Sequence, residues 1–417
     1  MFGGRPMDQL LRTHADAIVR ASIHAVLPDE AVKRALDGQE FSGRVLLVSA
    51  GKAAWQMAKA AYDFWGERIE NGVVVTKYDH VMGSIGNFSC FEAGHPVPDE
   101  NSFKGTQAAL DLVADLTEQD TVLFLLSGGG SALFEKPLVP GEVLQDVTYQ
   151  LLACGADIVE INTIRKRLSA VKGGRFAQHC APAKVFSIVL SDILGDPLDM
   201  IASGPAVPDS ATKEQALAIA KKYDLKMPEY AWELLEKETP KELNNVTTQI
   251  NGSVKELCVA AAAACRELGY EPILLTDQLC CQAKEAGSFL ASVLKTHAGS
   301  DKNLAFLAGG ETVVHLTGKG KGGRNQELAL AAAVGISGIP GAAVFSVGSD
   351  GTDGPTDAAG GYTDYTTASE LKAQGIEIFH VLKQNDAFHA LEKVGGLVYT
   401  GPTGTNVNDL AVALLRG

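Results

Sequence analysis

The chain has 417 residues, which suggests two or three domains, and it is 46% hydrophobic and 21% charged, a composition that supports packed globular cores. Its formal net charge of −14 argues against a nucleic-acid partner, because proteins that bind nucleic acids present basic surfaces. No apolar run reaches the roughly 18 residues of a membrane-spanning helix, so we expect no membrane partner.

The first half of the chain alternates between helical and strand-like patterns. Residues 7–25 predict an amphipathic helix, and the charges inside each apolar stretch near residue 1 are unlike a secretory signal, so we expect a cytoplasmic protein. Short β-branched runs predict strands at 44–51, 72–77, 121–129 and 184–192. Helical patterns follow at 52–67, 101–116, 141–154 and 162–180. Such alternation is typical of a mostly parallel sheet covered by helices on both faces.

A charged segment without strand patterns separates the two halves of the chain. Residues 210–252 predict helices followed by a connector, and we place a domain boundary near residue 240, giving domains 1–240 and 241–417. Strand-like runs resume at 271–276, 303–318, 342–350 and 396–402, and a short helix is expected to close the chain at Gly417. The prediction is an α/β protein of two domains with Rossmann-like, mostly parallel or mixed sheets.

Two strand ends carry patterns that suit phosphate, and open α/β sheets bind ligands beyond the carboxyl ends of their strands. Successive glycine amides in "SGGGS" can form a concave nest for phosphate oxygens, although a tight strand-to-helix turn would also need glycines. The pattern predicts cofactor contacts from Ser127, Gly128, Gly129, Gly130 and Ser131. Lys52 follows the strand at 44–51 near a helix start, where a lysine opposes the helix dipole unless an anion binds there.

Asp192 ends the strand at 184–192 and is a candidate for two roles. A carboxylate at this place suits Mg²⁺, which takes one or two carboxylates together with phosphate oxygens and water. It could instead accept a hydroxyl proton as a general base. Residues 162–179 carry five positive charges and no acid, and we expect Arg165, Lys172 and Arg175 to form a local basic surface.

The densest pattern is "GKGKGGR" at 318–324. Its glycines match the G-x-G-x-x-G of dinucleotide-binding loops, but no acid lies ~20 residues further on, where such loops hold the ribose. The interleaved cations instead suit the terminal phosphates of a nucleotide, which predicts cofactor contacts from Lys319, Gly320, Lys321 and Gly322. Arg324, at the helix start, can hold a carboxylate or a transferring phosphoryl group in a bidentate manner.

Residues 346–364 follow another strand and contain four acids among five glycines. Asp350 and Asp353 are predicted to line the nucleotide site, with Asp353 as a metal ligand in addition to Asp192. The segment after the last predicted strand adds three polar candidates, Asn406, Asn408 and Asp409.

Taken together, these ordered motifs resemble the MOFRL-type, or class II, glycerate 2-kinases. The resemblance covers nearly the whole chain, through "SAGKA", "LLSGGGSALF", "NTIRKRLSAVKGGRFA", "SDILGDPLDMIASGP", "AGGET", "GKGKGGRNQELAL", "SVGSDGTDGPTDAAG" and "GPTGTNVNDL". It implies transfer of the ATP γ-phosphoryl group to D-glycerate, giving 2-phosphoglycerate, with a divalent metal and a site in an interdomain cleft. Lys52 and Arg324 match the basic active-site positions of that family.

The residues fit this resemblance, because phosphoryl transfer depends on positioning and charge neutralisation. Lys52, Arg324 and Asp192 are the predicted catalytic residues, ATP and Mg²⁺ the predicted cofactors, and D-glycerate the substrate, with a homodimer as a possible assembly. One alternative is an NAD(P)-dependent hydroxypyruvate reductase, favoured by the glycine match at 318–323. A second is a non-catalytic sugar-phosphate sensor, which leaves Asp192 and the acidic loop unexplained.

Overall fold

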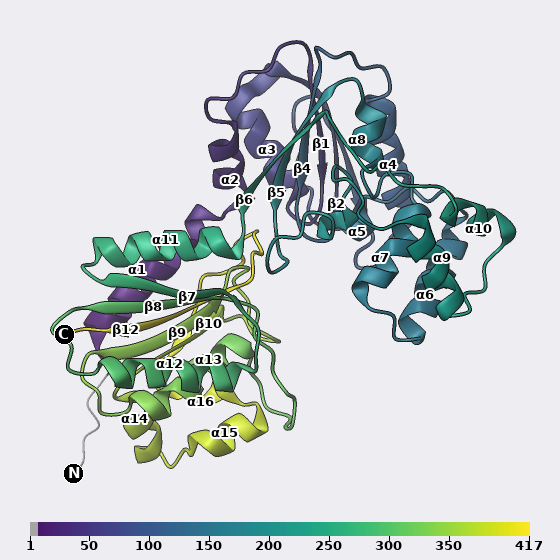
Figure 1. The fold of residues 1–417 in the computed structure, drawn as a ribbon. Coiled ribbons are helices and arrows are strands. Elements are labelled where there is room, and N and C mark those ends of the chain that lie inside the picture. Colours follow the sequence, from purple (N-terminus) through teal and green to yellow (C-terminus); the bar gives the residue numbers. More distant parts are fainter. Residues whose placement is uncertain (1–6) are drawn as a thin grey trace. The chain divides into compact units, whose positions relative to one another are not determined.

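The computed structural model describes residues 7–417, which form two compact units (Figure 1). The inserted unit is Pro28–Asn251, and the terminal unit combines the described residues up to Leu27 with Gly252–Gly417. We had placed the boundary near residue 240 and kept residues 1–27 with the first domain. The structure therefore divides the chain at a later residue and groups its first helix with the carboxyl-terminal half.

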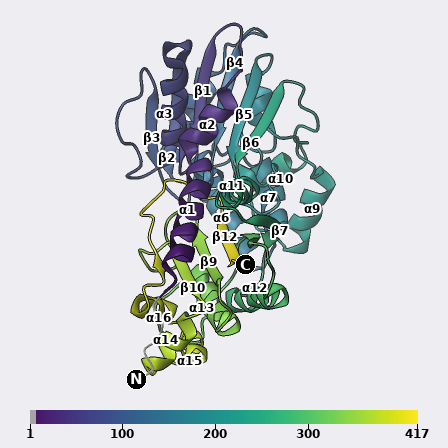
Figure 2. The same cartoon turned by 90° about the vertical axis from the view of Figure 1, so that its left-hand side faces the viewer.

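Helix α1 (Gln9–Ala25) belongs to the terminal unit because of what its apolar stripe covers. Leu11, Ile18 and Ile23 are buried, and α1 packs beside α11 (Val254–Glu267), as Figure 2 also shows. The guanidinium group of Arg12 donates hydrogen bonds to the carbonyl oxygens of Gly395, at 3.0 Å, and Leu397, at 2.9 Å. These contacts fix the start of the chain on segments close to its end.

The inserted unit contains a six-stranded sheet in the order β3-β2-β1-β4-β5-β6. Its strands are β1 Val45–Ala50, β2 Ile69–Lys77, β3 Ser89–Ala93, β4 Thr121–Leu126, β5 Lys184–Leu190 and β6 Val246–Gly252. Strands β1 to β5 pair in parallel, so the predicted parallel sheet is confirmed. Two of its strands, β3 and β6, were not predicted from the sequence.

Helices cover both faces of this sheet, and alternate residues of each strand face the two layers. Leu123 and Leu125 of β4 pack with α2 (Pro28–Leu36) and α3 (Ala54–Trp65). Phe124 faces the opposite layer with α4 (Glu100–Leu112) and α8 (Arg175–Cys180) (Figure 1). This burial on both faces explains the unbroken apolar runs of the strands.

A separate helical group completes the inserted unit. It consists of α6 Gly141–Ala153, α7 Ile158–Arg167, α9 Lys213–Lys222 and α10 Glu229–Leu235, packed around their own apolar core (Figure 1). The single helix predicted at 162–180 is wrong, since α7 ends at Arg167 and α8 begins at Arg175. The intervening loop holds Gly173 and Gly174 at φ angles of 58° and 83°, a conformation that interrupts a right-handed helix. Shorter elements are α5 Gly130–Leu133 and the 3₁₀ turns η1 Gly66–Arg68 and η2 Ile201–Ser203.

The terminal unit contains a mixed sheet in the order β11-β10-β9-β12-β8-β7. Its strands are β7 Glu271–Leu279, β8 Leu304–Gly310, β9 Ala342–Gly348, β10 Gly360–Asp364, β11 Leu397–Val398 and β12 Asp409–Leu415. Strand β7 is parallel to β8, whereas β12 is antiparallel to β8 and β9, and β10 is antiparallel to β9 and β11. The sheet is mixed, as the prediction allowed.

The short helix predicted at the end of the chain is wrong, because these residues form β12. All seven residues of β12 are buried in the centre of the sheet, between β8 and β9. A short apolar run of this kind has no periodicity that separates a buried strand from a helix. The strand predicted at 303–318 is also too long, since β8 ends at Gly310 and a loop follows.

Helices α12 (Ala283–His297) and α13 (Arg324–Ile336) cover the face of this sheet opposite α1 and α11 (Figure 1). Three short helices, α14 Thr367–Ala373, α15 Ile378–Gln384 and α16 Ala387–Lys393, lie together beside α13 (Figure 2). Within residues 7–417, no helix combines the length and the apolar character that crossing a membrane requires.

Candidate functional site

In the inserted unit, the carboxyl ends of β1, β4 and β5 bring the predicted residues Lys52, Gly128 and Asp192 to one edge of the sheet. The amide of Lys52 donates to the carbonyl oxygen of Gly128 at 2.9 Å, which joins the loops after β1 and β4. The hydroxyl of Ser127 accepts the amide of Ala53 at 3.0 Å, just before α3 begins. Ser127 thus fastens the two loops together, a role the phosphate-nest prediction did not include.

The three glycines of this loop allow other groups to approach its backbone closely. A Cβ atom on Gly128 would lie 2.1 Å from Oδ2 of Asp192, and one on Gly129 would lie 2.9 Å from the ring of His95 and 3.1 Å from Cγ of Lys52. Gly129 also has a φ of +83°, which favours glycine. The glycines therefore gather a lysine, a carboxylate and an imidazole around one loop, whether or not their amides bind phosphate.

His95 is the member of this group that sequence reasoning missed. It follows β3 (Ser89–Ala93), and no strand was predicted there, so its position at the same sheet edge was not evident. Burial lowers the pKa of His95, and the nearby charges of Lys52 and Lys77 lower it further. The ring is therefore held in its neutral form at neutral pH, beside the predicted anion-binding lysine.

The prediction of a basic surface at Arg165, Lys172 and Arg175 is wrong, because Lys172 is fully buried and the two arginines are half-buried. Nζ of Lys172 donates to the carbonyl oxygen of Ser131 at 2.8 Å and lies 3.4 Å from Glu135, and both side chains have no exposed surface. Nη2 of Arg165 donates to the same carbonyl at 3.2 Å. Burial lowers the pKa of Lys172 to about 8. Lys172 and Arg165 therefore hold the carbonyl group of Ser131 in place, and Glu135 balances the charge of Lys172.

A strained turn packs against the same loop. Ala202, Ser203 and Gly204 have φ angles of 52°, 61° and 63°, and such left-handed residues outside glycine are uncommon. Cβ of Ala202 lies 2.7 Å from where a Cβ on Gly130 would be. The hydroxyls of Ser203 and Ser131 are 3.0 Å apart. Backbone strain of this kind is concentrated at functional sites, where the surrounding structure maintains it.

The terminal unit carries a second group of predicted residues, around a cavity of about 710 Å³. Its walls include Lys319, Gly320, Gly322, Arg324, Asp350 and Asp353. The predicted loop after β8 and the acidic loop after β9 therefore face the same space, as their positions at strand ends implied.

Arg324 lies at the start of α13, and carboxylates of the chain itself hold it. Its Nε and Nη2 atoms donate to the two oxygens of Asp409, at 2.5 and 3.0 Å, and Nη1 donates to Glu311 at 2.8 Å. Burial disfavours the charge, but the hydrogen bonds and the charge of Asp409 raise the pKa of Arg324 above its ordinary value. The bidentate face that we assigned to a ligand is occupied by Asp409, and the Arg324 side chain is 33% exposed, so a ligand would meet only that exposed part.

The amides of the glycine loop are also engaged. Those of Thr317 and Gly318 both donate to Oδ1 of Asn385 at 2.8 Å, that of Gly320 to the carbonyl of Gln384 at 2.8 Å, and that of Lys321 to Asp386 at 2.9 Å. A Cβ on Gly318 or Gly320 would collide with the same turn, which runs from Gln384 to Asp386. At Gly318 and Gly320 the glycine pattern therefore reflects close packing on this turn.

The two lysines of the loop differ in their surroundings. Nζ of Lys321 lies 4.1 Å from the ring centroid of Phe388, a cation–π contact that engages it within the chain. Lys319 lines the cavity together with Arg324. Of the two lysines, Lys319 is the better placed to meet phosphate.

Asp353, predicted as a metal ligand, has both carboxylate oxygens engaged by backbone amides. Its Oδ1 accepts the amide of Asn325 at 3.1 Å and its Oδ2 accepts the amide of Gln326 at 2.9 Å, so it satisfies the start of α13. It is 3% exposed, and burial raises its pKa to about 7. Asp350 is more accessible, and its Oδ1 accepts the amide of Thr352 at 3.0 Å.

Across the described part of the chain, no group of three or more His, Cys, Asp or Glu side chains has the arrangement of a metal site. Mg²⁺ that accompanies phosphates needs only one or two carboxylates. Asp192 lies half-buried beside the glycine loop of the inserted unit, and both it and Asp353 remain predicted metal ligands.

Comparisons with known proteins cover both units. Residues 14–236 match the model of a domain of unknown function, DUF4147, and residues 304–409 match that of the MOFRL family. A D-glycerate 2-kinase from Thermotoga maritima is 54% identical over 411 residues, which cover 97% of this chain and 98% of that protein. The crystal structure of a glycerate kinase from the same organism matches with a TM-score of 0.95 at 53% identity, covering 98% of this chain and 100% of the other. A protein of Agrobacterium vitis that carries hydroxypyruvate reductase as a provisional name is 38% identical, covering 89% of this chain and 100% of its own length.

Proposed function

Because the chain belongs to the MOFRL-type glycerate 2-kinase family, we propose that it transfers the γ-phosphoryl group of ATP to the 2-hydroxyl of D-glycerate. The observation that carries the proposal is the meeting of Lys52, His95 and Asp192 around Gly128 and Gly129 at the carboxyl edge of a parallel sheet. The products are 2-phosphoglycerate and ADP.

The reaction requires side chains that stabilise the charge of the transferring group, accept the proton of the hydroxyl and bind Mg²⁺. The substrate oxygen forms a bond to the γ-phosphorus as the bond to the departing ADP oxygen breaks, so negative charge spreads over the transferring group. Lys52, at the anion-binding edge, and Arg324, beside the nucleotide loop, are assigned to that charge. Asp192 is assigned either to the proton that leaves the hydroxyl or to the Mg²⁺ that accompanies ATP.

When bound, Mg²⁺ neutralises phosphate oxygens, and Asp192 is the residue that would hold it. The dependence of an Asp192→Asn variant on Mg²⁺ separates the two roles. A metal ligand would shift the Mg²⁺ concentration needed for half-maximal rate, whereas a base would lower the rate at saturating Mg²⁺.

The reductase alternative loses its main support in the geometry of the glycine loop. The sequence evidence for a reductase was the G-x-G-x-x-G match. In dinucleotide sites, those glycines expose backbone amides to the pyrophosphate. Here the amides of Gly318 and Gly320 donate to the turn at Gln384–Asp386 instead.

The test combines D-glycerate, ATP and Mg²⁺ with the purified protein and identifies the product by ³¹P NMR, with NADH and hydroxypyruvate assayed in parallel. We expect 2-phosphoglycerate without NADH oxidation. Lys52→Ala and Arg324→Ala should each lower turnover by at least about 100-fold, as loss of transition-state charge stabilisation does. Lys104→Ala and Arg266→Ala, which remove exposed cations of other helices, are the matched controls. NADH oxidation without phosphoryl transfer would overturn the proposal.

A further inference from the structure

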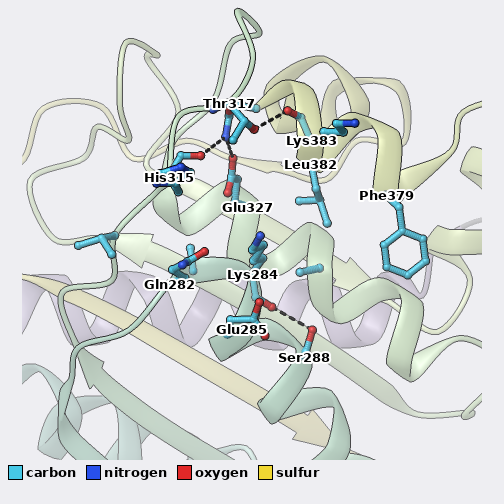
Figure 3. A pocket seen from close by; sticks show the side chains of 14 residues that line it. Gln282, Lys284, Glu285, Ser288, His315, Thr317, Glu327, Phe379, Leu382 and Lys383 are labelled. Atoms are coloured by element: carbon cyan, nitrogen blue, oxygen red, sulfur yellow. Dashed lines mark hydrogen bonds between the residues drawn. The ribbon is translucent and has the colours of Figure 1, made fainter.

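The terminal unit has a second cavity, of about 460 Å³ (Figure 3). Its walls come from the start of α12, the loop after β8, one face of α13, and α15. The residues that we predicted from sequence do not line it, and the roles assigned above leave it without an occupant.

The two cavities share part of their lining. Val313, Glu327 and Asn385 contribute to both. The two cavities therefore meet at these residues, and a ligand whose phosphates lie near Lys319 and Arg324 would extend past Glu327 and Asn385 to reach the second cavity. A nucleoside triphosphate in this arrangement would place its phosphates in the first cavity and its sugar and base in the second.

The second cavity is lined by both polar and apolar side chains. At the shared wall, the carboxylate of Glu327 accepts a hydrogen bond from Asn385 at 2.7 Å, and Lys284 lies beside Glu327 in Figure 3. Glu327 is 4% exposed, and burial raises its pKa. Ala331, Phe379 and Leu382 supply the apolar part of the lining, and Phe379 is largely exposed to solvent.

We propose that this cavity receives the nucleoside of ATP, with the ribose hydroxyls at Glu327 and the base against Phe379 and Leu382. The proposal rests on the kinase function above, since it assigns the rest of the same substrate. A buried carboxylate is a suitable acceptor for ribose hydroxyls, as in dinucleotide sites. An aromatic ring beside an aliphatic side chain gives a base a surface on which to stack.

Phe379 allows a test that spares the fold, because its side chain is 72% exposed. Phe379→Ala should raise the KM for ATP by about tenfold, the size of a lost stacking contact, with kcat and the KM for D-glycerate unchanged. Phe289→Ala removes another exposed phenylalanine of the same unit, outside the cavity, and should leave all three constants unchanged. Equal KM values for ATP in the two variants would overturn the assignment of the base.

The ribose assignment has its own measurement, the ratio of kcat/KM for ATP to that for 2′-deoxy- or 3′-deoxy-ATP. Wild type should prefer ATP by about tenfold, and Glu327→Gln should reduce this preference, because a neutral acceptor bonds the hydroxyl less strongly. The ratio cancels any general effect of the substitution on the loop. A preference unchanged in the variant would remove Glu327 from the ribose site.

A third measurement needs no variant. Photolabelling of wild-type protein with 8-azido-ATP should mark peptides from 282–288 or 379–385, and marking confined to other segments would refute the site. Failure of the nucleoside site can be distinguished from failure of the proposed function. If the kinase function is wrong, wild type forms no phosphoglycerate from ATP. If only the nucleoside site is wrong, wild type still forms phosphoglycerate, and the variants and the photolabel do not behave as expected.

Discussion

A methyl group at Gly128 is expected to displace the carboxylate of Asp192. The added Cβ would lie 2.1 Å from Oδ2 of Asp192, and ordinary contact begins at 3.4 Å, so the carboxylate must retreat by about 1.3 Å. Gly128 does not have a positive φ, so the backbone itself accepts alanine. A misplacement of about 1 Å at a reacting group costs on the order of 100-fold in rate, and we expect kcat to fall by that factor in Gly128→Ala.

Steady-state kinetics with saturating ATP and D-glycerate measures this effect, and the melting temperature reports whether the fold is intact. Gly141→Ala is the matched control, since it adds a methyl group at the first residue of α6, away from Asp192. Adding Asp192→Asn to Gly128→Ala should cause little further loss, because both changes act on one carboxylate. A kcat within threefold of wild type in Gly128→Ala would refute the role of Asp192 at this position.

Three further outcomes are expected. Asp409→Asn should lower kcat by about tenfold through loss of one charge-assisted hydrogen bond to Arg324, and an unchanged kcat would show that Glu311 alone suffices. Lys172→Met should destabilise the protein by about 3 kcal/mol in urea unfolding, because the buried Glu135 loses the closer of its two cationic partners and keeps only Arg165, with part of the loss recovered in the double variant with Glu135→Leu. Burial lowers the pKa of His95, so the unfolded chain binds the proton of His95 more tightly and the melting temperature should drop as pH falls below 6.5. His95→Gln should lessen that drop, and equal pH profiles would contradict the assigned burial.

The strands that could be predicted are those whose composition reflects burial on both faces. Strands β1, β4 and β5 are runs of Val, Leu, Ile and Phe, and all were placed to within three residues at each end. Strands β3, "SCFEA", and β10, "GGYTD", lack such runs, since their neighbours in the sheet rather than their own residues determine their conformation.

For the candidate site, the rule that ligands gather at strand ends correctly grouped Lys52, Gly128 and Asp192. The partners of the loop at 318–321 could not be foreseen, because the turn that accepts its amides lies 67 residues later in the case of Gly318 and Asn385. A local glycine pattern cannot distinguish a nest for phosphate from a surface for close packing. The five cations at 162–179 were likewise ambiguous, because Glu135 and Asp209, which pair with Lys172 and Lys166, lie outside that stretch.

The division of the chain into an inserted and a terminal unit has a consequence for biosynthesis. Helix α1 leaves the ribosome first, but the sheet it covers requires β12, which ends at Leu415. At translation rates of about 5–20 residues per second, α1 remains without its partner for tens of seconds while the inserted unit can fold. Its apolar stripe is exposed throughout that interval and is a natural target for a chaperone. A fragment that begins at Gly252 would lack α1 altogether, so a soluble, isolated MOFRL unit should require residues 7–27 to be attached at a new position.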